Sequence, residues 1–471
     1  MGQSGIMDLS RREYLVFIIL LGVGSVLVSY AAGKVLKKKD LFLPLLIFLN
    51  SLILHSFYIT YTDTWVRQHD VIGFGNRKGI GQAALIEYLL NEGRLPDFDP
   101  TTRWGFFQPL LHHIIAAAAL KISLLRGMNF DRACESLQIL TLIYSMVFIF
   151  YGFRILALMG LKGKALYLAE ALLAFHPVLI LLSGSINNDM LSHMFLVMAV
   201  YYVLKWQRED RLTDLLLTAL FTGLSMMSKL SGVLIAPAAA FLMLNRLISE
   251  RKDRERLLKR IREYALFALI VFPLGLFFPL RNLILFHVPL TYMPEVGEDL
   301  SGYSLLQRFI DVRTQTPYAC MIKNGNPYDE FNIFLMLIKT GLTGEYDYGI
   351  YNPYITAFAW LLFISGSLLF ITVSIIFILH LRGKLIKEVP IRVFWSILIL
   401  TGILFQLRLM LSVPNFSSGD LRYIAWIILP AALLTGLYAD SGSKNAVRPI
   451  YLGSGVFILS SAAVYYLLGL P

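Results

Sequence analysis

Apolar stretches of about 18 to 25 residues follow one another along almost the whole chain, with polar connections between them. A helix of this length crosses a hydrocarbon core of roughly 30 Å, because each residue adds about 1.5 Å. The pattern therefore predicts an all-α polytopic membrane protein with about 12 transmembrane helices. The expected spans are 15–33, 41–61, 131–153, 165–183, 189–205, 213–229, 231–247, 264–286, 354–381, 391–412, 423–440 and 449–468.

Two connections, 62–130 and 287–353, are much longer than the others. The first contains apolar residues at helical spacing in 79–92 and again in 112–125, which predicts two interfacial helices. In the second, 331–342 is apolar but too short to span, so a re-entrant or interfacial helix is expected. The pattern thus indicates an additional N-terminal helix in 1–40, a membrane module in 41–286, the second long loop, and C-terminal helices in 354–471.

Lysine and arginine gather in every second connection, six in all, and this sets the expected orientation. The positive-inside rule places these connections in the cytoplasm, and both long loops and both termini on the opposite face. The formal charge of +11 then follows from topology and from attraction to anionic headgroups, so no nucleic-acid partner is expected. The basic run 249–263 is predicted to be a solvated or headgroup-binding helix. The basic inner loops favour a multi-pass protein of the inner cell membrane.

The composition excludes several classes of protein and of site. The chain is 57% hydrophobic and only 15% charged, outside the range of soluble globular proteins. Cys134 and Cys320 have no metal-ligand spacing, and a disulfide between them is the less favoured alternative to two thiols. Glycines at 73, 75, 79 and 81 lack the Lys-Ser/Thr ending of a phosphate loop, which argues against a nucleotide-sugar donor.

Candidate chemistry is concentrated in the predicted outer segments. The first long loop opens with Asp63 and His69-Asp70, continues through Gly93-Arg94-Leu95-Pro96, and includes Phe107-Gln108-Pro109-Leu110-Leu111-His112-His113. Later outer turns carry Asn187-Asn188-Asp189, Ser228-Lys229-Leu230-Ser231-Gly232, Arg281-Asn282 and Asp420-Leu421-Arg422-Tyr423. The order and sidedness of these motifs over about residues 41 to 440 resemble the polytopic GT-C glycosyltransferases of the bacterial protein-mannosyltransferase and aminoarabinose-transferase type.

The resemblance implies a GT-C fold and a transferase that moves a sugar from a polyprenyl-phosphate donor to a glycan, lipid or protein acceptor. The reaction would take place at the extracytoplasmic face and invert the anomeric carbon. It needs a carboxylate base, for which Asp70 beside His69 is the first candidate and Asp63 the second. Either acid could instead cap a turn or pair with Arg67. Asp189 is a further catalytic candidate that positions the acceptor or holds a divalent ion, unless it only caps the following helix.

Cations are expected to bind the donor phosphate, and Lys229, Arg281 and Arg422 lie at the outer ends of predicted spans. The alternative for these residues is snorkelling to the interface. The expected substrate-binding residues are His112, His113, Asn188 and the second-loop residue Tyr292. Two adjacent histidines on a helix point about 100° apart, so they are not expected to share a metal, although Mg or Mn stays open as a cofactor.

The competing hypothesis is a lipid-linked sugar flippase or another polytopic transporter. Such a protein should place charged residues near the middle of the bilayer, within reach of both faces. The acids of this chain instead gather on one predicted face, which favours glycosyl transfer.

Overall fold

The computed structural model describes residues 11–65, 73–76, 78–290, 292–294, 300–312, 316–317, 321–323, 326–328, 330–345 and 353–469. The described chain is a bundle of helices. They are α1 (Arg11–Val35), α2 (Phe42–Tyr61), α3 (Gly81–Glu92), α4 (Leu111–Leu125), α5 (Phe130–Glu135), α6 (Gln138–Leu158), α7 (Gly163–Ala174), α8 (Pro177–Gly184), α9 (Asp189–Glu209), α10 (Leu212–Ser228), α11 (Ala236–Glu250), α12 (Arg254–Phe286), α13 (Leu305–Ile310), α14 (Ile333–Thr343), α15 (Pro353–Leu381), α16 (Val389–Ser412), α17 (Ile428–Ser441) and α18 (Lys444–Leu467).

Each predicted span overlaps one helix or two consecutive helices, but the count of twelve is not confirmed. Within the described residues, nine helices are long and apolar enough to cross a membrane, and the bent pair α7 and α8 makes a tenth. The helix α10 is too short to pass this test. The helix α9 carries charged residues and is buried along most of its length, so its surface faces other helices rather than lipid.

The fold class is confirmed, with one small departure. Two short strands, β1 (Met321–Lys323) and β2 (Asn326–Tyr328), pair antiparallel in the second long loop. The three predicted interfacial segments all form helices, namely α3, α4 and α14. Sequence signals explain their ends: α3 stops at Gly93 with φ +63, and Asn332 caps α14 by accepting from the backbone N–H groups of Phe334 and Leu335.

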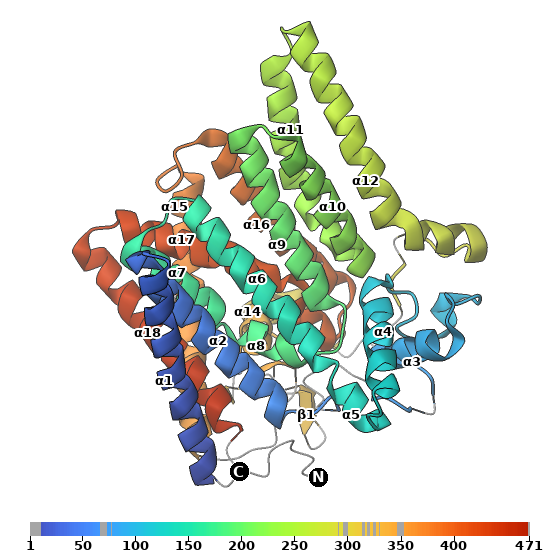
Figure 1. Cartoon of the computed structure of the whole chain (residues 1–471), viewed down its shortest axis with the longest axis horizontal. Helices are drawn as coiled ribbons and strands as arrows, with labels where there is room; N and C mark the ends of the chain where they lie inside the picture. The colour runs from blue at the N-terminus through green and yellow to red at the C-terminus, as the bar shows by residue number, and fades with distance from the viewer. Residues whose placement is uncertain are drawn as a thin grey trace.

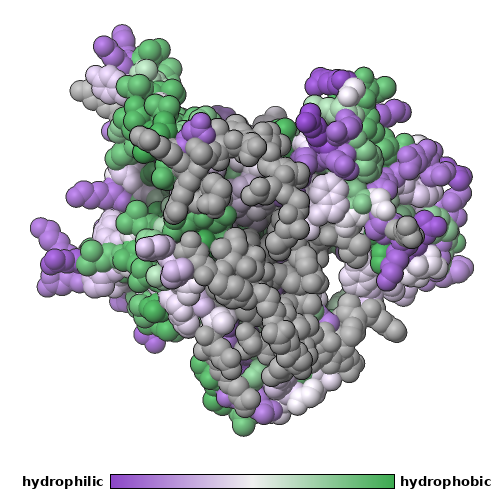
Figure 2. All heavy atoms as spheres, turned by 90° about the horizontal axis from the view of Figure 1, so that it is seen from below, coloured by the Kyte–Doolittle hydropathy of each residue, from purple (hydrophilic) through white to green (hydrophobic). Residues whose placement is uncertain are grey.

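The two ends of the bundle differ in character. The first long loop with α3, α4 and α5, and the strand β1 of the second, lie at the lower end in Figure 1, which we call the loop-bearing end. The start of α1 is at this end too, because Tyr14 packs on Phe57 near the end of α2, with ring centroids 4.3 Å apart. The hairpin of α11 and α12 extends from the opposite end, which we call the basic end. Seen from the loop-bearing end, hydrophilic residues collect on the side where α3 lies (Figure 2).

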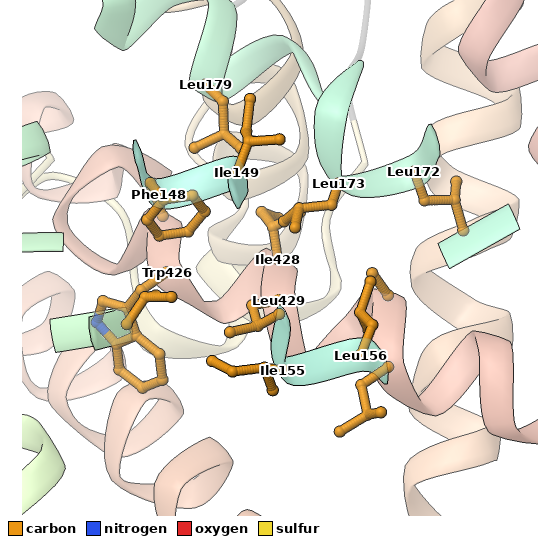
Figure 3. Packing of buried hydrophobic residues seen from close by; sticks show 14 of the residues in the cluster. Phe148, Ile149, Ile155, Leu156, Leu172, Leu173, Leu179, Trp426, Ile428 and Leu429 are labelled. Carbon is orange, nitrogen blue, oxygen red and sulfur yellow. The ribbon is translucent and has the colours of Figure 1, made fainter. Parts of the chain in front are cut away.

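The main hydrophobic core lies where α6, α7, α8, α9 and α17 meet. Figure 3 shows Phe148 and Ile149 of α6 packed with Leu173 of α7 and Leu429 of α17. Gly152 leaves room for Leu173 where α6 and α7 meet, because a Cβ at this position would lie 2.3 Å from Cδ2 of Leu173 and that side chain would have to shift. This core fixes the loop-bearing ends of α6, α8 and α9, from which the candidate site is built.

Candidate functional site

The buried carboxylate of Asp189 is the centre of the candidate site. Asp189 is the first residue of α9 and is only 2% exposed. It accepts a hydrogen bond from Nζ of Lys229, which follows α10, and its Oδ2 lies 3.8 Å from Nε of Arg422. Arg422 belongs to a 3-10 helix, Leu421–Ile427, that precedes α17. Three predicted site residues from distant parts of the sequence therefore meet in one place.

The side-chain amide of Asn188 and a tight turn at Gly232 hold the elements of the site together. The side chain of Asn188 donates to the backbone oxygen of Ser228 at 2.9 Å and to Oε1 of Gln108 at 3.3 Å. These bonds join the starts of α9 and α4 to the end of α10. Gly232 allows the chain after Lys229 to turn tightly, because a Cβ at this position would lie 2.5 Å from the backbone carbon of Ser225.

An aromatic ring lies beside both cations. Nζ of Lys229 is 4.6 Å from the ring centroid of Tyr423, and the guanidinium carbon of Arg422 is 5.0 Å from the same ring. The guanidinium also donates to the Tyr423 hydroxyl at 3.1 Å. The ring therefore makes cation–π contacts with both positive groups, which also form ion pairs with Asp189.

Two further acids, which were not among the expected site residues, surround Arg422. Its guanidinium lies 3.3 Å from Oδ2 of Asp420 and 3.6 Å from Oε1 of Glu345. Asp420 and Glu345 therefore share the Arg422 guanidinium as a neighbour. His193, one turn after Asp189 on α9, contacts the Arg422 backbone oxygen at 2.7 Å. Asp420 and His193 stand two and four residues from predicted site residues, whereas Glu345 is one of several acids in its loop and has no distinguishing sequence signal.

His112 and His113 are fully buried at the start of α4 and turn toward different partners. Burial lowers the pKa of His112 to about 4, and the nearby negative charge of Asp189 opposes this shift. Burial also lowers the pKa of His113, whose Nε2 contacts Oε1 of Gln82 on α3. Both imidazoles are therefore neutral at pH 7, and His112 is the one next to the Asp189 centre.

Arg281 and Tyr292 lie against the first long loop rather than at the Asp189 centre. Arg281 donates to the backbone oxygen of Pro96 at 2.5 Å, and the ring of Tyr292 packs on Phe107 with centroids 5.4 Å apart. These contacts join the end of α12 and the segment after it to the loop that carries α3.

Asp63, the second base candidate, lies just after the end of α2. Asp63 accepts a hydrogen bond from the backbone N–H of Trp65 at 2.8 Å, which forms a local turn. Glu135 accepts from the backbone N–H of Thr64 at 3.2 Å, and Gln138 of α6 donates to the backbone oxygen of Thr62 at 3.0 Å. The other two predicted residues, His69 and Asp70, lie outside the described residues.

No metal ligand set is evident in the part of the chain that the structure describes. Within it, no group of three or more His, Cys, Asp and Glu side chains could hold a metal ion. Asp189, the expected candidate for such a role, instead has two cations as its neighbours.

Comparison with known proteins relates this arrangement to one fold. Residues 108–277 match the family model described as dolichyl-phosphate-mannose-protein mannosyltransferase. The apo structure of ArnT from Cupriavidus metallidurans aligns with a TM-score of 0.55 at 12% identity, covering 93% of this chain and 77% of that one. The structure of the same protein bound to undecaprenyl phosphate aligns with a TM-score of 0.53 at 12% identity, covering 90% and 76%. Comparison with curated protein sequences gives no match.

At this identity the solved structures show the fold alone, and the family model adds the sequence pattern. The matched segment contains Asp189 and Lys229 of the site and the nearby His112, whereas Arg422 lies beyond its end. The predicted resemblance to the GT-C glycosyltransferases is therefore confirmed, and with it the prediction that the chain is a membrane glycosyltransferase.

Proposed function

We propose that this GT-C glycosyltransferase moves a sugar from a polyprenyl-phosphate donor to an acceptor at the loop-bearing end, with inversion at the anomeric carbon. One observation carries the proposal: Lys229 and Arg422 are both held on the buried carboxylate of Asp189. The family model is named for a dolichyl-phosphate-linked sugar donor, and one similar structure contains undecaprenyl phosphate. By the positive-inside rule, the loop-bearing end faces outward from the inner cell membrane.

The cation pair suits a departing phosphate. Both positive groups lie near the ends of membrane helices, where the headgroup of a lipid carrier would sit. The arginine can bind two phosphate oxygens at once, while the lysine supplies a compact point charge. Preorganised cations that face the charge of a leaving group stabilise the transition state without having to reorganise.

Asp189 is better suited to positioning than to accepting a proton. A carboxylate with two cations beside it binds a proton weakly, because both positive charges favour its ionised form. We therefore assign to Asp189 the role of aligning Lys229 and Arg422 for the phosphate.

The general base is then an acid of the first long loop. Asp63 has no cation within ion-pair distance among the described residues, and Glu135 is its acidic neighbour. Asp70 stays the first candidate from the sequence, with Asp63 as the alternative. Either would remove the proton from the acceptor hydroxyl of a glycan, lipid or protein as that hydroxyl attacks the anomeric carbon.

Turnover of a radiolabelled polyprenyl-phosphate sugar in proteoliposomes tests this function. The wild type should release polyprenyl phosphate and transfer the label. Asp70→Asn should lower turnover by at least about 100-fold while donor binding persists, because a general base contributes 10²- to 10⁴-fold. If Asp63 is the base, Asp63→Asn should show this loss instead. Asp97→Asn is the matched control, since this acid of the same loop pairs with Arg94 at the surface.

Two results would contradict the proposal. Full activity of both Asp70→Asn and Asp63→Asn would remove the first loop from the mechanism. Movement of the intact lipid-linked sugar between leaflets, without cleavage, would make the protein a flippase.

A further inference from the structure

A group of buried polar atoms next to Asp189 has no hydrogen-bond partner among the described residues. The atoms are both ring nitrogens of His112 on α4, the hydroxyl of Tyr144 on α6 and Nδ2 of Asn187 in the turn before α9. His112 and Asn187 are at most 1% exposed, and Tyr144 is 6% exposed. Buried polar atoms are nearly always paired, so several unpaired ones together indicate a place where a polar ligand binds.

Ring and hydrogen-bond contacts connect these residues into one site. The rings of His112 and Tyr144 have centroids 6.1 Å apart and meet edge to face. Oδ1 of Asn187 accepts from the backbone N–H of Asp189 at 3.1 Å, so its amide nitrogen is left for another partner. The hydrogen bond from Asn188 to Gln108 joins the start of α9 to the start of α4, and so brings His112 to the same region as Asp189; the negative charge of Asp189 also acts on the pKa of His112.

The site lies along α6 between the two parts of the proposed reaction centre. Gln138, two turns before Tyr144 on α6, holds the turn that carries the base candidate Asp63 through its bond to the Thr62 backbone. Its own Oε1 is a further buried atom without a partner. On the other side of Tyr144 lies the ring of His112, followed by Asp189 with its two cations, Lys229 and Arg422. An inverting transfer needs the sugar between the base and the departing phosphate.

The side chains of His112, Tyr144 and Asn187 are all uncharged at pH 7. Tyr144 and Asn187 carry no charge at pH 7, and burial keeps His112 neutral with one donating and one accepting nitrogen. Hydroxyl groups of a sugar both donate and accept, so they can pair with a phenol, an amide and an imidazole together. The nearest carboxylate, Asp189, is already paired with Lys229.

We infer that His112, Tyr144 and Asn187 form the subsite for the donor sugar, and that this subsite takes an uncharged sugar that pairs through its hydroxyls. The inference rests on the proposed function and extends it, because it assigns Tyr144 and Asn187 to binding of the sugar and not of its phosphate. On the Asp189 side of the subsite, the carboxylate already has Lys229 and Arg422 as partners, so a cationic amino sugar would find no unpaired carboxylate there among the described residues.

The test compares two ligands of the full-length protein. One is undecaprenyl phosphate, and the other is the same lipid phosphate carrying a neutral hexose. Tyr144→Phe should weaken binding of the hexose-bearing lipid by about 10-fold, the loss of one hydrogen bond, and should change binding of the bare lipid phosphate by less than about two-fold. Asn187→Ala should show the same split. Tyr151→Phe, about two turns further along the same helix toward the basic end, where its ring packs on Tyr201, is the matched control and should change neither affinity.

The outcomes separate this inference from the proposed function. An equal loss for both ligands in Tyr144→Phe, or no loss for either, overturns the sugar subsite but leaves the proposed function in place. A lipid phosphate carrying a cationic amino sugar that binds as tightly as the hexose-bearing lipid overturns the neutral specificity. If Lys229→Met binds bare undecaprenyl phosphate as the wild type does, the failure belongs to the proposed phosphate site.

Discussion

Replacing Lys229 by methionine should separate the stability of the site from its function. The lysine and Asp189 side chains are 15% and 3% exposed, so they form a buried ion pair. Removing one partner of such a pair costs about 3–5 kcal/mol, because the remaining charge stays buried. Arg422 still lies 3.8 Å from Asp189 in the variant, and we therefore expect the lower value, about 3 kcal/mol.

The same change should weaken phosphate binding. One charge-assisted hydrogen bond contributes about 1.5–3 kcal/mol, so affinity for undecaprenyl phosphate should fall roughly 10- to 150-fold. Adding Asp189→Asn removes the second charge of the pair and should recover much of the lost stability. Arg422 keeps Asp420 and Glu345 as partners in this double variant. Phosphate affinity should not recover, because the cation is still missing.

A matched pair at the basic end provides the control. Lys205 lies 3.3 Å from Asp214, and their side chains are 20% and 4% exposed, close to the values at the site. Lys205→Met should therefore lower stability by a similar amount and leave phosphate binding unchanged. Denaturant unfolding in detergent and binding of labelled undecaprenyl phosphate measure the two quantities. Wild-type phosphate affinity in a folded Lys229→Met variant would refute the reasoning and leave Arg281 as the alternative cation.

Two further predictions concern buried groups elsewhere in the chain. Arg260 is 4% exposed and pairs with Glu250, Glu263 and Asp210, so it joins α12 to α11 and to the end of α9. Arg260→Leu should lower the free energy of unfolding, measured with denaturant, by about 3–5 kcal/mol, whereas the exposed Arg256→Leu should lower it by less than about 0.5 kcal/mol. Equal losses in the two variants would contradict a stabilising role for this network. Because the pKa of His112 is lowered from 6.5 to about 4, the unfolded chain binds a proton that the folded chain does not, so stability should decrease as pH falls from about 6.5 toward 4. His112→Gln should reduce this slope by up to about 1.4 kcal/mol per pH unit, and an unchanged slope would show that His112 is protonated in the folded protein.

The helices were predictable because each span has a continuous apolar run that can form in lipid only as a helix. The strands β1 and β2 were not predicted, since segments of three residues carry no periodic signal. The number of spans also could not be read from hydropathy alone. The helix α9 is surrounded by other helices, so it retains charged residues that a lipid-facing helix would exclude.

The meeting of Asp189 and Lys229 could be predicted from the sequence, because their motifs mark the ends of predicted spans. Asp189 and Lys229 both stand at helix ends, and alternating spans place those ends together. Arg281 also lies near the end of a predicted span, but the last part of α12 turns away from the bundle in Figure 1, where the helix contains Pro273 and Pro279. Glu345 follows α14, and its contact with Arg422 depends on how the second loop folds back. Sequence spacing alone contains no information on that fold.

The most direct test of the central claim is an experimental structure of the protein with undecaprenyl phosphate. The account predicts density for the phosphate within hydrogen-bond distance of both Lys229 and Arg422, with the lipid tail leaving the site toward the membrane. Phosphate density bound only at Arg281, or only at the basic end, would contradict the assignment of this site to the donor.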